Sequence, residues 1–243
     1  MKAARWLLLL SVSFLLPARA DLTIVQKIEG AGSISEMTIK IKGDKARVEA
    51  SPEVTTIIDS KSGEMLSLLN DKKKFLRISG DKAKAVAEMA TRFGGEKQPQ
   101  EKPKLTPTGK KETIGGYEAE EYSCVAPKFK ASYWIAPQYP NSAAIVKQMQ
   151  AMTPASWSAG ITSMPDYRDF PGLPIRTNIN MEGKQITSTI TAVKQDPLPD
   201  AQFSAPADYQ EMKMPNIGKM LGGKSEKTRD EPATNSPEPS ARP

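Results

Sequence analysis

The stretch MTIKIKGDKARVEA, residues 37–50, decides the fold class. Met37, Ile39 and Ile41 alternate with threonine and lysine, and after the pair Gly43-Asp44 apolar residues again occupy every second position. Because successive side chains of a strand point to opposite faces, this period of two predicts two antiparallel strands with one buried face. Glycine followed by aspartate between them is typical of a hairpin turn.

The same alternation continues through most of the chain and predicts about ten or eleven strands. Six of them precede any helix, and turn-like glycine, proline and aspartate residues separate neighbouring strands. The predicted strands are 22–28, 37–42, 46–50, 54–59, 65–69, 75–79, 110–114, 117–125, 129–135, 175–181 and 184–193.

Two segments change to the helical period. Between Asp81, which can cap a helix, and Gly94, which can end one, the apolar residues Val86, Met89 and Phe93 form one stripe. This spacing predicts a helix of about three turns whose apolar stripe needs a sheet to lie on. The polar, proline-containing stretch that follows predicts a loop.

A second helix is expected after Asn141, a residue that favours helix starts. Its apolar stripe is Ile145, Val146, Met149 and Met152. Since the two helices stand between blocks of strands, the pattern favours an α+β fold. We expect a strongly curved antiparallel sheet with the two helices on one of its faces.

The first twenty residues, MKAARWLLLLSVSFLLPARA, have the three parts of a secretory signal peptide. A basic start precedes an apolar run too short to span a bilayer, and Ala18-Arg19-Ala20 forms the cleavage site. We therefore expect a mature protein that begins at Asp21 and is exported, to the periplasm or alternatively outside the cell. An uncleaved membrane anchor is the alternative.

The chain accordingly divides into three predicted parts: a signal peptide at 1–20, a single domain at 21–214, and a tail at 215–243. The tail is rich in proline, serine, glycine and charge, a composition that predicts disorder. Residues 153–174 contain four prolines and two glycines among aromatic residues, which predicts a packed or functional flap.

The composition excludes several classes of enzyme. The 243 residues include one cysteine and no histidine, so Ser-His-Asp catalysis, Cys-His catalysis and histidine-containing zinc sites are impossible. A serine–lysine dyad stays open, although no S-x-x-K motif begins a predicted helix. We predict no enzyme activity, no catalytic residue, no cofactor and no metal.

The charge of the chain is weak for a nucleic-acid-binding protein. Cleavage after Ala20 would leave 31 basic and 28 acidic residues, a net charge of +3. Together with export, this charge predicts no nucleic-acid partner, and it leaves a weak attraction to anionic membrane surfaces open.

The stretch GGYEAEEYSC, residues 115–124, ends at the single cysteine. Cys124 follows Tyr122 on a predicted strand, and the chain lacks the partners that a catalytic or metal-binding thiol needs. We expect Cys124 to pack as a small apolar side chain, with an intermolecular disulfide as the alternative in an oxidising compartment.

Several motifs in this order resemble an exported bacterial family, domain of unknown function 4412. They are KIKGDKARVEASPEVTTIIDSKSGEM, KKFLRISGD, LTPTGKKETIGGYEAEEYSC, SYWIAPQYP and LPDAQFSAPADYQEM, and the resemblance spans residues 22–212. The ending D-x-x-F-x-x-P-x-x-Y, carried by Asp200, Phe203, Pro206 and Tyr209, is similar to that of periplasmic lipoprotein carriers and receptors of the LolA/LolB type. That similarity implies an unclosed, strongly bent antiparallel sheet with helices over an apolar inner face.

Two functions from different classes follow. The first is a binding protein whose half-barrel holds an apolar ligand, such as an acyl chain or a lipoprotein tail. The second is an envelope protein-interaction or sensing module with a filled core, in which the flap and tail make the contacts. In either case we expect a monomer without a transmembrane span. The predicted lining residues, which the second function assigns to the core, are Met37, Ile39, Ile41, Leu76, Ile78, Met89, Phe93, Trp134, Ile145 and Met149.

Overall fold

The structure, a computed structural model, describes residues 20–30, 32–85, 103–126, 129–152, 165, 167–181 and 183–213. Residues 1–19 of the predicted signal peptide, the whole of the predicted tail, and residues 153–164 and 166 of the flap lie outside this part of the chain. Every helix within it is too short or too polar to cross a membrane.

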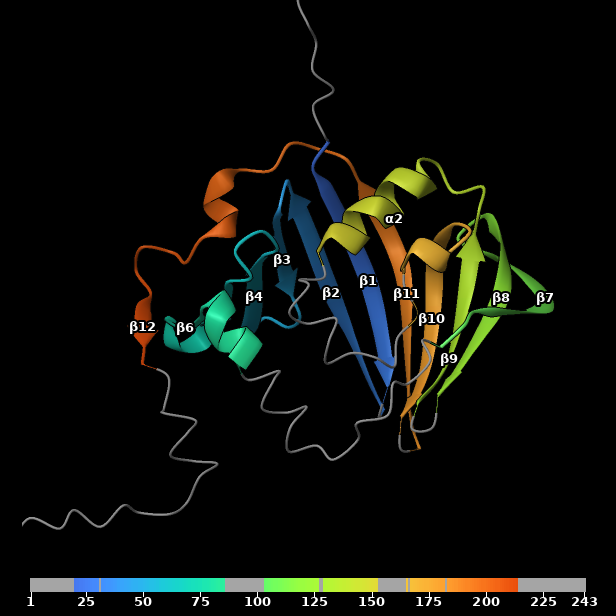
Figure 1. Cartoon of the computed structure of the whole chain (residues 1–243), viewed down its shortest axis with the longest axis horizontal. Coiled ribbons are helices and arrows are strands. Elements are labelled where there is room, and N and C mark those ends of the chain that lie inside the picture. The colour runs from blue at the N-terminus through green and yellow to red at the C-terminus, as the bar shows by residue number, and fades with distance from the viewer. Residues whose placement is uncertain are drawn as a thin grey trace, which may run out of the picture. The chain divides into compact units, whose positions relative to one another are not determined.

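The described strands form one sheet (Figure 1), which confirms the predicted fold class. The order across the sheet is β12-β6-β5-β4-β3-β2-β1-β11-β10-β9-β8-β7, and its two edge strands do not pair with each other. All neighbours are antiparallel except β12 and β6, which are parallel. The strands are β1 (Leu22–Gly30), β2 (Ser33–Lys42), β3 (Lys45–Glu49), β4 (Val54–Asp59), β5 (Met65–Leu69), β6 (Lys74–Ile78), β7 (Thr106–Ile114), β8 (Tyr117–Ala126), β9 (Phe129–Ala136), β10 (Leu173–Met181), β11 (Lys184–Lys194) and β12 (Gln210–Met212).

The second predicted helix is α2 (Ser142–Ala151), which lies across β1, β11 and β10 in Figure 1. Asn141 occupies its N-cap position, but the side chain does not cap the helix as expected. The backbone of Asn141 is left-handed, with φ 56°, and its amide nitrogen donates to Oε1 of Gln195 at 3.0 Å. Asn141 therefore ties the helix start to the end of β11.

The first predicted helix begins one residue earlier than expected, and residues 80–85 are helical. The carbonyl of Ser79 accepts from the N–H of Ala83 at 2.9 Å, and Oγ of Ser79 accepts from the N–H of Lys82 at 3.4 Å. Ser79 thus takes the capping role expected of Asp81. The predicted stripe Val86, Met89 and Phe93 lies outside the described residues. Three short 3-10 helices complete the fold: η1 (Asn70–Lys72), η2 (Tyr167–Asp169) and η3 (Asp200–Phe203).

Both faces of the sheet are apolar, and each has its own core. On the face that packs against α2, here called the inner face, Leu22, Ile24 and Ile41 are buried together with Ile145 and Val146 of the helix. On the opposite, outer face of β4–β6, a second cluster is buried: Ile57, Leu66, Leu68, Phe75 and Phe203. In β4–β6, therefore, both faces of the sheet carry apolar residues, and neither face is a polar surface exposed to solvent.

Cys124 belongs to a third cluster, between β8, β9 and η2. Its side chain is fully buried opposite Ala131, and Phe170 meets the ring of Tyr133 edge-on at 5.1 Å between centroids. Burial also raises the pKa of the Cys124 thiol. The structure thus shows the strand packing that the sequence indicated.

A buried thiol with a raised pKa is a poor nucleophile, because the thiolate is the reactive form. We expect the native protein to react with a thiol reagent such as DTNB only after unfolding in denaturant, with one equivalent released per chain. Rapid labelling without denaturant, or a covalent dimer on a non-reducing gel, would contradict this placement of Cys124.

Candidate ligand-binding face

The inner face of β2–β6 is built from two rows of paired residues. Strand register places Ile39, Val48, Thr56, Ser67 and Leu76 side by side in one row. The second row, beside it, contains Ile41, Ala46, Ile58, Met65 and Ile78. The short hydroxyl side chains of Thr56 and Ser67 are the polar members of these two rows, so the surface is almost wholly apolar.

Coverage of this face changes from β1 towards β6. Ile41, Ala46 and Ile58 are buried in the cluster with α2, whereas Leu76 and Ile78 are only half-buried. The other apolar residues on this face of β3–β6 remain partly accessible, although Met65 also packs against the α2 cluster. We call them the β3–β6 inner face, which consists of Val48, Val54, Met65, Leu69, Leu76 and Ile78.

The structure separates the ten predicted lining residues into three groups. Those in or against the α2 cluster are Ile39, Ile41, Trp134, Ile145 and Met149. Met37, Leu76 and Ile78 are half-buried on the inner face of β2 and β6. Met89 and Phe93 lie outside the described residues. Val48, Val54, Met65 and Leu69 were missed, although the alternation of their strands places them on the same face.

Trp134 differs from the other members of its group. It lies opposite Arg176 and Glu121, whereas its neighbours Tyr133 and Ile135 pack in the cluster around Cys124. Successive strand residues point to opposite faces, so Trp134 does not share the face of Tyr133 and Ile135. The sequence carried a signal for this, because Lys130 and Ser132 share the parity of Trp134 and make it the more polar side of β9.

The outer face is closed by residues 198–212, which we call the C-terminal strap. Phe203 is buried against β4–β6, and the Tyr209 hydroxyl donates to Oδ1 of Asn70 at 3.2 Å. The N–H of Tyr209 donates to the carbonyl of Pro206 at 3.0 Å, which turns the chain into β12. The motif D-x-x-F-x-x-P-x-x-Y thus acts by fastening the end of the domain to the sheet.

Charged contacts fix the strap at both of its ends. Nζ of Lys42 lies 2.8 Å from Oδ1 of Asp200, and this hydrogen bond raises the pKa of Lys42 and lowers that of Asp200. Lys73 and Asp208 form a similar pair at 2.9 Å, in which the hydrogen bond lowers the pKa of Asp208. The guanidinium of Arg47 also donates to the carbonyl of Gln202 at 3.0 Å.

The lowered pKa of Asp200 predicts a small dependence of stability on pH. A carboxyl group with a depressed folded-state pKa stabilises the fold above its unfolded pKa, and this contribution disappears as the pH falls through the folded value. Asp200→Asn should therefore be less stable than the wild type at pH 7, and the difference should become smaller at pH 3, where the carboxyl group of the unfolded chain is largely protonated. Urea unfolding at both pH values tests this, and an equal gap at both would contradict it.

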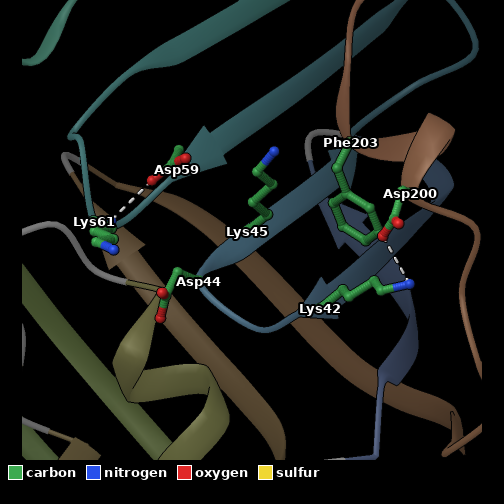
Figure 2. Close-up of a pocket in the computed structure, with 7 residues that line it drawn as sticks. All are labelled: Lys42, Asp44, Lys45, Asp59, Lys61, Asp200 and Phe203. Carbon is green, nitrogen blue, oxygen red and sulfur yellow. Dashed lines mark hydrogen bonds and ion pairs between the residues drawn. The ribbon is translucent and has the colours of Figure 1, made fainter.

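One pocket lies away from the inner face, beside the β2–β3 and β4–β5 turns and near η3 (Figure 2). Its volume is about 330 Å³, and it is lined by Lys42, Asp44, Lys45, Asp59, Lys61, Asp200 and Phe203. Burial raises the pKa of the Asp59 carboxyl group. Hydrogen bonds donated to it by the backbone N–H groups of Ser62 and Lys61 have the opposite effect, and the pKa is lowered overall. Six charged residues of both signs around one aromatic ring do not suit an acyl chain.

Comparisons with known proteins place the chain in one family. The family model described as Domain of unknown function (DUF4412) matches residues 21–209. No curated protein sequence matches the chain.

Solved structures similar to the chain are distant. PNGF-II has a TM-score of 0.42 and 14% identity over 83% of this chain, which spans only 33% of PNGF-II. The lipoprotein LppX of Mycobacterium tuberculosis has a TM-score of 0.38 and 13% identity, with 73% of this chain and 88% of LppX covered. The MucA/MucB complex of Pseudomonas aeruginosa gives 0.36 and 15%, with 81% of this chain and 59% of that chain covered. Likenesses at this level say nothing about the ligand or partners of this protein.

Proposed function

The chain belongs to the family described as Domain of unknown function (DUF4412), and we propose that it is an exported, non-enzymatic binding protein. Its half-barrel holds an apolar ligand, such as an acyl chain or a lipoprotein tail, against the β3–β6 inner face. Met37 on β2 and the helix that follows β6 in the chain belong to the same proposed site.

The unequal closure of the two faces of β4–β6 carries the proposal. The protein covers the outer face itself, because the strap places Phe203 over Leu66, Leu68 and Phe75. On the inner face of the same strands, Leu69, Leu76 and Ile78 stay half-buried. Apolar surface left partly accessible beside a packed core is the usual lining of a ligand site.

Burial on an apolar surface of this kind can hold an acyl chain. Burying a methylene group gains about 0.8 kcal/mol, so ten buried methylenes gain on the order of 8 kcal/mol before the cost of association. Met65 lies on this surface and Met37 belongs to the same proposed site, and their flexible thioethers adapt to chains of different shape.

The predicted domain limits, 1–20, 21–214 and 215–243, are part of the proposal. The contacts of Asp21 support a mature chain that begins there. Its Oδ2 accepts from the N–H of Leu198 at 2.7 Å and lies 3.8 Å from Nζ of Lys42. Intact mass of the exported protein decides the point, and a retained 1–20 segment would exclude it.

The alternative function, an envelope interaction or sensing module, is favoured by a different observation. Ile41 and Ile145, two of the predicted lining residues, are buried in the core under α2, and Ile39 and Met149 pack against them. If that core continues across β3–β6, no space remains for a ligand, and the protein acts through its surface.

Native mass spectrometry of the protein purified from its own cell envelope separates these functions. We expect an added mass of lipid that is lost after extraction with organic solvent. Delipidated protein should regain the mass on incubation with a fatty acid. Purification without lipid but with a stoichiometric envelope protein would replace the carrier function by the interaction module.

A further inference from the structure

One end of the sheet carries exposed apolar side chains on three separate hairpins. The turns β1–β2, β8–β9 and β10–β11 all lie at this end, which is the lower end of the sheet in Figure 1. We call it the hairpin end. The turns β2–β3 and β4–β5 lie at the opposite end.

Among the described residues, the exposed large hydrophobic side chains are all at the hairpin end. They are Ile34, Val125 and Ile186, with exposed fractions of 69%, 63% and 43%. Isolated exposed aliphatic residues are ordinary, but their collection at one end of the sheet indicates a contact surface.

Strand register shows that these three residues lie within the last rows of the sheet. Ile186 is opposite Gly30, and Ile34 is opposite Glu29 on the other side of β1. Val125 is opposite Lys130, in the row that continues through Asn180 to Gln185, the neighbour of Ile186. With strands about 4.8 Å apart, the five steps from β8 to β2 cover roughly 24 Å along the sheet.

Two exposed lysines lie at this end among the described residues. Lys130 and Lys184 are exposed, and no ion pair joins either of them to another described residue. Glu29 lies at the same end, but Nζ of Lys27 is 2.8 Å from its Oε1, and Glu36 lies opposite Lys27, farther from the turns. The exposed apolar tips are therefore accompanied by two lysines that form no ion pair within the described part of the chain.

We propose that the hairpin end docks on a bilayer that contains anionic headgroups. Aliphatic tips on separate hairpins can enter the headgroup layer independently, whereas Ile186 and Ile34 point to opposite faces of the sheet and form no common groove for a peptide. Lysines beside them attract anionic lipid, with roughly fivefold tighter binding per lysine near the surface. The surface goes beyond the proposed ligand site and does not depend on it.

Sedimentation of the full mature protein with vesicles tests this proposal. The vesicles are phosphatidylcholine alone or a 1:1 mixture with phosphatidylglycerol. We expect binding to the mixed vesicles that weakens with salt, and little binding to phosphatidylcholine. The triple variant Ile34→Ser, Val125→Ser, Ile186→Ser should bind the mixed vesicles more than about tenfold more weakly. Lys130→Ser with Lys184→Ser should also lose on the order of tenfold or more.

The matched control is Lys45→Ser with Lys61→Ser, which removes two exposed lysines from the opposite end of the sheet. It should bind as the wild type does if the hairpin end is the contact. Thermal unfolding of each variant checks the fold, and Ile34→Ser alone is used if the triple variant unfolds. The proposal is overturned if the wild type ignores mixed vesicles, or if the hairpin-end variants bind like the control.

Discussion

Phe203→Ala is expected to lower the free energy of unfolding by about 3–5 kcal/mol, as for other buried phenylalanines. Phe203 is almost fully buried on the outer face against Ile57, Leu66, Leu68 and Phe75. Its loss leaves a cavity and also frees the strap that pairs with β6 and covers the outer face. Urea unfolding followed by circular dichroism measures the change.

Ser204→Ala is the matched control for this experiment, because Ser204 is exposed and its hydroxyl donates within the strap, to the carbonyl of Ala201 at 3.2 Å. Surface changes of this kind stay within about 0.5 kcal/mol of the wild type. If Phe203→Ala costs no more than Ser204→Ala, the strap does not hold the outer face.

Ile24→Ala is expected to cost about 2–5 kcal/mol, because Ile24 is fully buried in the cluster under α2. Leu76→Ala, on the half-buried inner face of β6, should cost clearly less, since fewer contacts are lost. The comparison uses the same unfolding assay for both variants. Equal costs would mean that the β3–β6 inner face is as closed as the core under α2, which contradicts the proposed site.

The alternation of apolar residues was enough to predict most of the sheet. Each of β1–β11 overlaps a predicted strand, and the first six precede the first helix, as the periodicity indicated. The strand β12 was missed because Gln210–Met212 is too short to show a period, and its parallel pairing with β6 depends on where the strap returns. The bulge of β7 between Pro107 and Lys111 likewise hid the start of that strand.

The candidate site was harder to predict for a physical reason. Alternation tells which side of a strand a residue occupies, but not whether another element covers that side. Ile41 and Leu76 have the same pattern in the sequence, yet Ile41 lies in the α2 cluster and Leu76 lies beyond it. On the outer face, the covering element itself could not be predicted. Leu66 and Leu68 are covered by Phe203, which lies more than 130 residues later in the sequence.

Uptake of a fluorescent fatty acid by the delipidated protein tests the proposed ligand site most directly. The wild type should bind the probe saturably, with one site per chain. Ser67→Asp places a charge in the middle of the β3–β6 inner face and should abolish uptake, while Ser204→Asp on the strap should leave it unchanged. Circular dichroism confirms that both variants fold. A wild type that takes up no probe, or a Ser67→Asp variant that binds it as tightly as the wild type, would contradict the site.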